Sequence, residues 1–157
     1  EHASHTMEDL TETLLWLDRQ DNSSLSTSPV ALHSLVTTIS DELAYLLQGK
    51  EVSVAVETNE YTLEASPIAV RIVLGNLIRN AFQHTQVGSV TINQIGAGVE
   101  IINRNTDKPD SKETQTSLGF GLGLQMVSQL TAAMGWQYEY SMRDNGVHCV
   151  QITFEGN

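Results

Sequence analysis

Two asparagines and a histidine recur at four-residue intervals in one stretch of the chain, at Asn76, Asn80 and His84. Because residues four apart lie on the same side of an α-helix, these side chains would form one polar stripe, with the core-facing side of the helix opposite. Asparagine is a mediocre helix former, so two of them beside apolar residues need an explanation. One explanation is an amide oxygen offered to a hard cation such as Mg²⁺, and the other is a solvated or capping face.

A second stretch further along the chain alternates glycines with bulky apolar residues, as GFGLGL. Glycine permits backbone conformations and close approaches that other residues do not. A glycine-rich turn that opens a helix also directs N–H groups and the positive end of the helix dipole at an anion, typically a phosphate. The spacing differs from the Gly-x-Gly-x-x-Gly of dinucleotide-binding folds. A phosphate loop and a flexible entry into a core helix both fit the glycines alone.

The composition limits what such a site could bind. The chain has 157 residues, which suits one compact domain, and a net charge of −11. This charge would repel DNA or RNA, so we expect no nucleic-acid partner, whereas a nucleotide paired with a divalent cation remains possible. The single cysteine, Cys149, excludes an internal disulfide and a cysteine-based zinc site, and its apolar neighbours predict a buried thiol.

The elements that would position these residues follow from the apolar periodicity. Ser66 and Pro67 predict the start of a helix that runs to about His84. The other expected elements are a helix over about 32–47, strands at 52–56 and 61–63, a hairpin at 90–101, a helix after the glycines and a hairpin at 136–154. Residues 103–118 predict a long polar loop. This order predicts an α+β fold, a two-layer sandwich with a mixed, mostly antiparallel sheet and helices on one face.

The run NLIRNAFQHT, from Asn76 to Thr85, resembles the N box of histidine-kinase catalytic domains, and GFGLGL resembles their G2 box. The two motifs stand in the family's order with matching elements between them, and the resemblance covers about residues 30–157. It implies the Bergerat ATP-binding fold, which gyrase-type topoisomerases, MutL-type repair ATPases and Hsp90-type chaperones share. The nucleotide of that fold lies between helices and a mobile lid.

The resemblance implies a role for each matching residue of the N box. Asn80 would be the metal site, a Mg²⁺ ligand that bridges the ATP phosphates. Asn76 stands where ATP-hydrolysing relatives use a glutamate to activate water, and an amide cannot act as that base, which suits a kinase. Asn76 and Asn80 are therefore the candidate catalytic residues. His84 would lie near the ribose and adenine, and Gln83 stands where many kinases place a lysine on the phosphates.

The resemblance also implies that the glycine-rich stretch lines the phosphates beneath a lid of roughly residues 104–118. The candidate contacts there are Ser117, Leu118, Gly119, Phe120, Gly121, Leu122, Gly123 and Leu124. One motif departs from the family pattern, because the G1 box, Asp-x-Gly-x-Gly, is replaced by NRNTD at 103–107. Asn103 stands for the adenine-reading Asp and can still accept from the adenine amino group, while Asn105 is the other candidate contact here. We expect weaker nucleotide binding, or a scaffold module that keeps the fold without the nucleotide.

Residues 1–20 predict a helix with an apolar seam of the a/d type, and residues 21–29 a polar linker. The helix resembles the end of the second helix in the dimerisation and phosphoacceptor bundle of these kinases; docking on the same domain is the alternative. The resemblance implies that ATP, with Mg²⁺, phosphorylates a histidine of that bundle outside this chain, for transfer to a response regulator. It further implies a homodimeric parent in the bacterial inner membrane, with this domain in the cytoplasm. An ATP-hydrolysing relative is the remaining alternative.

Overall fold

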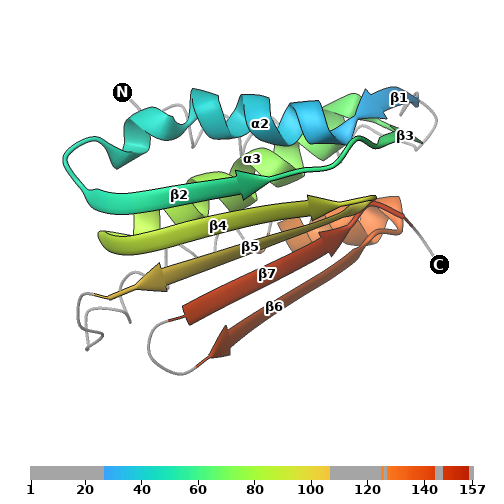
Figure 1. The fold of residues 1–157 in the computed structure, drawn as a ribbon. Helices are drawn as coiled ribbons and strands as arrows, with labels where there is room; N and C mark the ends of the chain where they lie inside the picture. Colours follow the sequence, from blue (N-terminus) through green and yellow to red (C-terminus); the bar gives the residue numbers. More distant parts are fainter. Residues whose placement is uncertain (1–26, 107–124, 126, 144–146, 156–157) are drawn as a thin grey trace.

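The computed structural model describes residues 27–106, 125, 127–143 and 147–155 (Figure 1). The elements, in chain order, are β1 (Ser28–Ala31), α2 (Leu32–Glu42), the 3-10 helix η1 (Ala44–Leu47), β2 (Glu51–Glu57), β3 (Thr62–Ala65), α3 (Pro67–His84), β4 (Val87–Ile95), β5 (Gly98–Asn105), β6 (Gln137–Arg143) and β7 (Val147–Thr153). Residues 127–134 form a further helix between β5 and β6.

Five strands form the main sheet, in the order β2-β4-β5-β7-β6. The β2–β4 pair is parallel, because α3 lies between these strands in the chain, and the other three pairs are antiparallel. Helix α3 and helix 127–134 lie behind the sheet in the view of Figure 1, and α2 lies beside α3. The predicted α+β sandwich, with a mixed and mostly antiparallel sheet, is confirmed.

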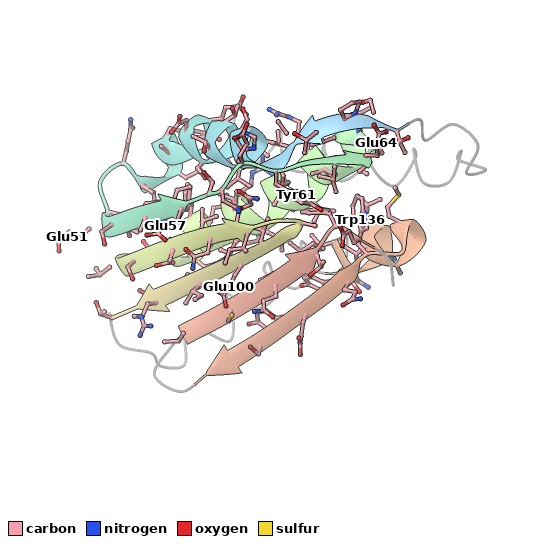
Figure 2. All side chains as sticks on the ribbon, turned by 45° about the vertical axis from the view of Figure 1, so that its right-hand side comes forward. Glu51, Glu57, Tyr61, Glu64, Glu100 and Trp136 are labelled. Carbon is pink, nitrogen blue, oxygen red and sulfur yellow. The ribbon has the colours of Figure 1, made fainter. Side chains whose placement is uncertain are left out.

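The strands alternate between an inner face toward the helices and an outer face. The buried apolar residues of the inner face are Val90, Ile92, Val99, Ile101, Val150 and Ile152. They form one core with the buried side chains of α2, α3 and helix 127–134. The outer face is polar and acidic, with Glu51, Glu57 and Glu100 on its strands (Figure 2). An anionic ligand would therefore meet less repulsion on the helix side of the sheet.

Helix α3 begins where the sequence predicts. The Ser66 Oγ accepts a hydrogen bond from the Ala69 N–H at 3.2 Å, and Pro67 occupies the first turn, where its missing N–H is not needed. The helix ends at His84, as expected, and Thr85 already has extended backbone. Both ends of the helix that carries the N box are thus set by local sequence.

The small sheet at the start of the domain is a finding that the sequence pattern did not predict. Strand β1 begins at Ser28, inside the expected linker 21–29, and pairs antiparallel with β3. The strand expected at 61–63 therefore exists as β3 but stands outside the main sheet. Pro29 suits such a two-stranded edge position because it has no N–H to donate. The imidazole Nδ1 of His33, which follows β1, accepts from the Tyr61 N–H at 3.1 Å and holds the two segments together.

Three predicted boundaries are wrong. The single helix expected over 32–47 ends at Glu42 and continues as η1, because Leu43 leaves helical geometry before the turn at Gly49, whose φ is +82°. The strand expected from Trp136 begins one residue later, and the Trp136 ring packs edge-on against Phe154 at 4.8 Å. The loop expected from residue 103 begins later, because pairing with β4 and β7 extends β5 to Asn105.

Candidate functional site

Helix α3 buries the two N-box asparagines. Asn80 is 8% exposed and Asn76 is 9% exposed, and their neighbours Leu77 and Ala81 belong to the core. The expectation that the stripe lies opposite the core-facing side is therefore wrong, as is its interpretation as a solvated face. The physical reason is that α3 packs against β5 on one side and against α2 and η1 on another, so an unusually wide arc of the helix is covered.

The two asparagines differ in their hydrogen bonding. The Asn76 Nδ2 donates to the Ile72 carbonyl of its own helix at 2.9 Å. The Asn80 Nδ2 is buried, and no group in the described part of the chain accepts a hydrogen bond from it. An unsatisfied buried polar group costs about 1–3 kcal/mol, so an amide in this state is a candidate ligand group. A half-turn of the amide would present its oxygen, the atom that a Mg²⁺ ion takes, at the same place.

His84 stands at the last turn of α3 as a neutral, half-buried imidazole. Burial is the largest cause that lowers the pKa of His84 to about 4, and electrostatic repulsion from His148 and from Lys50 contributes in the same direction. At neutral pH, His84 therefore adds no charge to the site. It can still donate or accept a hydrogen bond, or stack, beside a neutral group such as a sugar or a base.

One end of the inner face, on β5 and β7, carries further candidate residues. Asn103 is 4% exposed and lies directly opposite His148 in the strand register. The His148 Nδ1 is 2.7 Å from the Tyr140 hydroxyl, and the two rings stack with their centroids 6.0 Å apart. The Asn105 Nδ2 donates to the His84 carbonyl at 3.1 Å, so the end of α3 lies beside the end of β5, where Asn103 is opposite His148.

Asn105 has a structural role that the sequence did not show. Its Nδ2 donates to the His84 carbonyl at 3.1 Å, and its Oδ1 accepts from the N–H groups of Gln86 and Val87 at 3.4 Å. These bonds tie the end of α3 to the end of β5. The amide therefore fixes the position of His84, and its expected contact with a nucleotide stays a prediction.

Gln83 and Lys50 show how the charge near α3 is arranged. The Gln83 side chain is exposed, while its carbonyl oxygen accepts from the Lys50 Nζ at 3.1 Å. The same Nζ donates to the Phe82 carbonyl at 2.8 Å, so this ammonium group stabilises the negative end of the helix dipole. Partial burial lowers the pKa of Lys50. No sequence signal distinguishes Lys50, because its partner helix lies more than thirty residues away.

The sequence did contain a signal for His148. It alternates with Val150 and Ile152, which places it on the inner face of β7. Its bond to Tyr140 confirms a structural partner, and its position opposite Asn103 adds a place in the site. The expected buried thiol of Cys149 is confirmed on the outer face.

The remaining predicted contacts, Ser117 to Leu124, lie outside the described residues, as do residues 1–26, 144–146 and most of the expected lid. Helix 127–134 follows the glycine-rich stretch as predicted. Its residues Val127, Leu130 and Thr131 are buried, which confirms the expected apolar spacing.

Among the described residues, no group of three or more histidine, cysteine, aspartate or glutamate side chains could hold a metal ion. A cation beside Asn80 would thus take further oxygen atoms from a ligand and from water, as Mg²⁺ does with phosphates. The described helices include none with the length and apolarity to cross a membrane.

Comparison with protein-family models and with curated proteins finds no match. Solved structures do match. The cytoplasmic segment of histidine kinase QseC is 17% identical with a TM-score of 0.69, and the match covers 94% of this chain and 91% of that one. The catalytic domain of histidine kinase ThkA is 20% identical with a TM-score of 0.64, over 84% of this chain and 99% of that one.

Full-length ShkA in complex with AMPPNP is 22% identical with a TM-score of 0.69, over 96% of this chain and 36% of that one. Identities this low carry an argument about the fold and leave the chemistry to the residues. The chain therefore has the Bergerat fold of the ATP-binding catalytic domains of histidine kinases.

Proposed function

We propose that this chain is the catalytic domain of a sensor histidine kinase that binds Mg-ATP. The observation that carries the proposal is the Asn80 amide, which is buried on the N-box helix without a partner in the described structure. A phosphate oxygen would accept from the Nδ2 that lacks a partner, and after a half-turn of the amide a hard cation would bind its oxygen instead. The structurally similar ShkA was solved in complex with AMPPNP, which supports a nucleotide as the ligand of this fold.

The residues of the site fit such a ligand. Asn80 would hold Mg²⁺ and the phosphates, and the backbone of the stretch Ser117–Leu124 would contact the phosphates opposite. His84 is neutral and half-buried, which suits a place beside the ribose and base. Asn103 closes the inner end of the site with a group that can recognise a base edge.

The proposed chemistry is positioning with electrostatic stabilisation. When bound, Mg-ATP supplies the phosphoryl group, and the metal neutralises charge on the phosphates. Asn76 bonds its amide to its own helix and has no carboxylate that could activate water. The site is therefore suited to present the phosphate to another nucleophile, which we take to be a histidine of the dimerisation domain.

The proposal includes the wider signalling context that the resemblance implies. The phosphate would pass from that histidine to an aspartate of a response regulator, within a homodimer formed through residues 1–20. The parent would lie in the bacterial inner membrane with this domain in the cytoplasm. Restoring the bundle domain and following labelled phosphate from ATP to its histidine tests this part.

Calorimetric titration of nucleotide into the chain, with Mg²⁺ and with a chelator, tests the proposed binding. We expect Mg-dependent binding of ATP, with little turnover because position 76 has no carboxylate. No binding at millimolar Mg-ATP would favour the scaffold module that keeps only the fold. Sustained phosphate release by the chain alone would favour the ATP-hydrolysing relative.

A further inference from the structure

Strand β2 forms one edge of the main sheet, at the top of the sheet in Figure 1. On one side it pairs with β4, and no strand in the described part of the chain pairs with its other side. Such an edge presents N–H and C=O groups at alternate residues, which can bond to a further strand. With seven residues, β2 is long enough for this kind of pairing.

The inner face of β2 is open at its centre. Val52 and Val56 pack against the core, whereas Val54 between them is 38% exposed. The register places Val54 beside Val90 of β4, which is fully buried, so one flank of Val54 is covered by the sheet. The other flank is on the unpaired side of β2. An apolar side chain of an added strand, directly opposite Val54, would cover it there.

The outer face of β2 carries negative charge at both ends. Glu51 and Glu57 stand at these ends, and a serine and an alanine lie between them on the same face. Both glutamates are exposed, and no basic side chain in the described part of the chain forms an ion pair with either. The arrangement is symmetric about the centre of the strand. A partner strand running in either direction would therefore meet one carboxylate at each end.

These charges decide between two kinds of partner. A second copy that paired antiparallel through its own β2 would place Glu51 opposite Glu57 at both ends, and like charges directly opposite each other are destabilising. A strand with a lysine or arginine at each end would instead form two opposite-charge pairs. The net charge of −11 adds long-range attraction for such a basic segment.

We propose that the unpaired edge of β2 is a docking site for an extended segment of another protein, with alternating apolar residues and a basic residue at each end. The segment would add a sixth strand to the sheet by main-chain hydrogen bonds. Its inner side chains would cover Val54, and its basic residues would pair with Glu51 and Glu57. This docking does not depend on nucleotide binding.

The test uses the full chain and the peptide KVTVTVK, blocked at both termini, with EVTVTVE as its counterpart. Fluorescence anisotropy measures the affinity of both labelled peptides for the unmodified chain and for Glu51→Lys/Glu57→Lys. The unmodified chain should prefer the lysine-ended peptide by about tenfold or more, and the double variant should reverse the preference. Hydrogen exchange of the unmodified chain with KVTVTVK should slow at the amides of residues 51–57.

Glu64→Lys/Glu139→Lys is the matched control. It changes the net charge by the same amount at exposed positions of β3 and of β6, which forms the opposite edge of the main sheet. This variant should keep the preference of the unmodified chain. An equal loss of preference in the control would overturn the proposal, because the peptide would then respond to net charge alone or bind at β6.

Three further results would overturn the proposal. The first is no binding of KVTVTVK at millimolar concentration, and the second is slowed exchange at β6 in place of β2. The third is a dimer of the unmodified chain at neutral pH with β2 protected, which would assign the edge to a second copy. If the double variant does not fold, the peptide preference and the exchange pattern of the unmodified chain decide the question.

Discussion

Asn80→Ala should strongly weaken Mg-dependent nucleotide binding and leave the ligand-free chain almost as stable as before. The substitution deletes a buried amide whose Nδ2 has no acceptor in the described structure, which relieves about 1–3 kcal/mol of unsatisfied burial. The shortened side chain also loses packing contacts, which costs about 0.8 kcal/mol of stability for each CH₂-sized group. The two effects oppose each other, so we expect a net change within about 1 kcal/mol, or about 2–4 °C in Tm.

The ligand should respond far more strongly. A bond from an amide to a charged partner contributes about 1.5–3 kcal/mol, which corresponds to a Kd about 10- to 150-fold weaker in Asn80→Ala. Calorimetric titration of Mg-ATP measures this change, and thermal unfolding without nucleotide measures the stability. A chelator arm shows whether the lost affinity is the part that depends on Mg²⁺.

Gln94→Ala is the matched control, because it also truncates a buried amide on the inner side of the domain. The Gln94 Nε2 donates to Asn59 Oδ1 at 3.2 Å and to the Gly96 carbonyl at 2.8 Å, and its Oε1 accepts from the Asn59 N–H at 2.9 Å. Here the truncation leaves satisfied groups without partners, so we expect a loss of about 1–3 kcal/mol and unchanged nucleotide affinity. If Asn80→Ala lowers Tm as much as Gln94→Ala does, the Asn80 amide is structural and the reasoning is refuted.

Further predictions concern backbone geometry and titrating groups. Gly88→Ala should lower the free energy of unfolding by about 2 kcal/mol or more in urea titrations, because φ is +152° and a Cβ would collide with the Arg104 carbonyl. Gly75→Ala, whose Cβ meets nothing within 4 Å, should raise it by about 0.5–1 kcal/mol. Because the pKa of His84 falls from 6.5 to about 4 on folding, stability should decrease as pH falls through this window, and less so in His84→Phe. The Tyr138 hydroxyl is buried without a described partner, and burial raises its pKa from 10.0 to about 12, so the chain should lose stability as pH rises above 10.0. Tyr138→Phe should reduce that loss, because Tyr140 also contributes to it, and should stabilise the chain by about 1 kcal/mol at neutral pH. Unfolding midpoints measured against pH check both predictions. In the unmodified chain, a midpoint that does not change below pH 6.5 would contradict the pKa given for His84, and one that does not change above pH 10.0 would contradict that of Tyr138.

Features set by neighbouring residues could be predicted from the sequence. Ser66 and Pro67 fix the start of α3 through a local cap, and the hairpins of the main sheet follow from alternating apolar residues. Pairing between distant segments could not be predicted in this way. The parallel β2–β4 pair and the β1–β3 sheet depend on how α2 and α3 pack, and no residue within the strands specifies the partner.

The orientation of the asparagine stripe shows the same limit in the site itself. A helical pattern gives the side of the helix on which Asn76 and Asn80 lie, and the apolar residues suggest that the core is opposite. Because α3 packs against β5 and also against α2 and η1, the buried arc extends to both asparagines. The N box and its order relative to the glycine-rich stretch could be read from the sequence. The places of Lys50 and Tyr140 near α3 and His148 could not, because they depend on tertiary contacts.

The contrast between the two asparagines carries the functional argument further than the motif does. Both have the same side chain, lie one turn apart on one helix and are buried to a similar extent. Asn76 bonds to its own helix, so its burial is complete without a ligand. Asn80 has no such bond in the described structure, although the carbonyl one turn earlier offers the same possibility in principle. A fold that needed only stability would be better served by an apolar residue there, so the amide at position 80 is best explained by what the site binds.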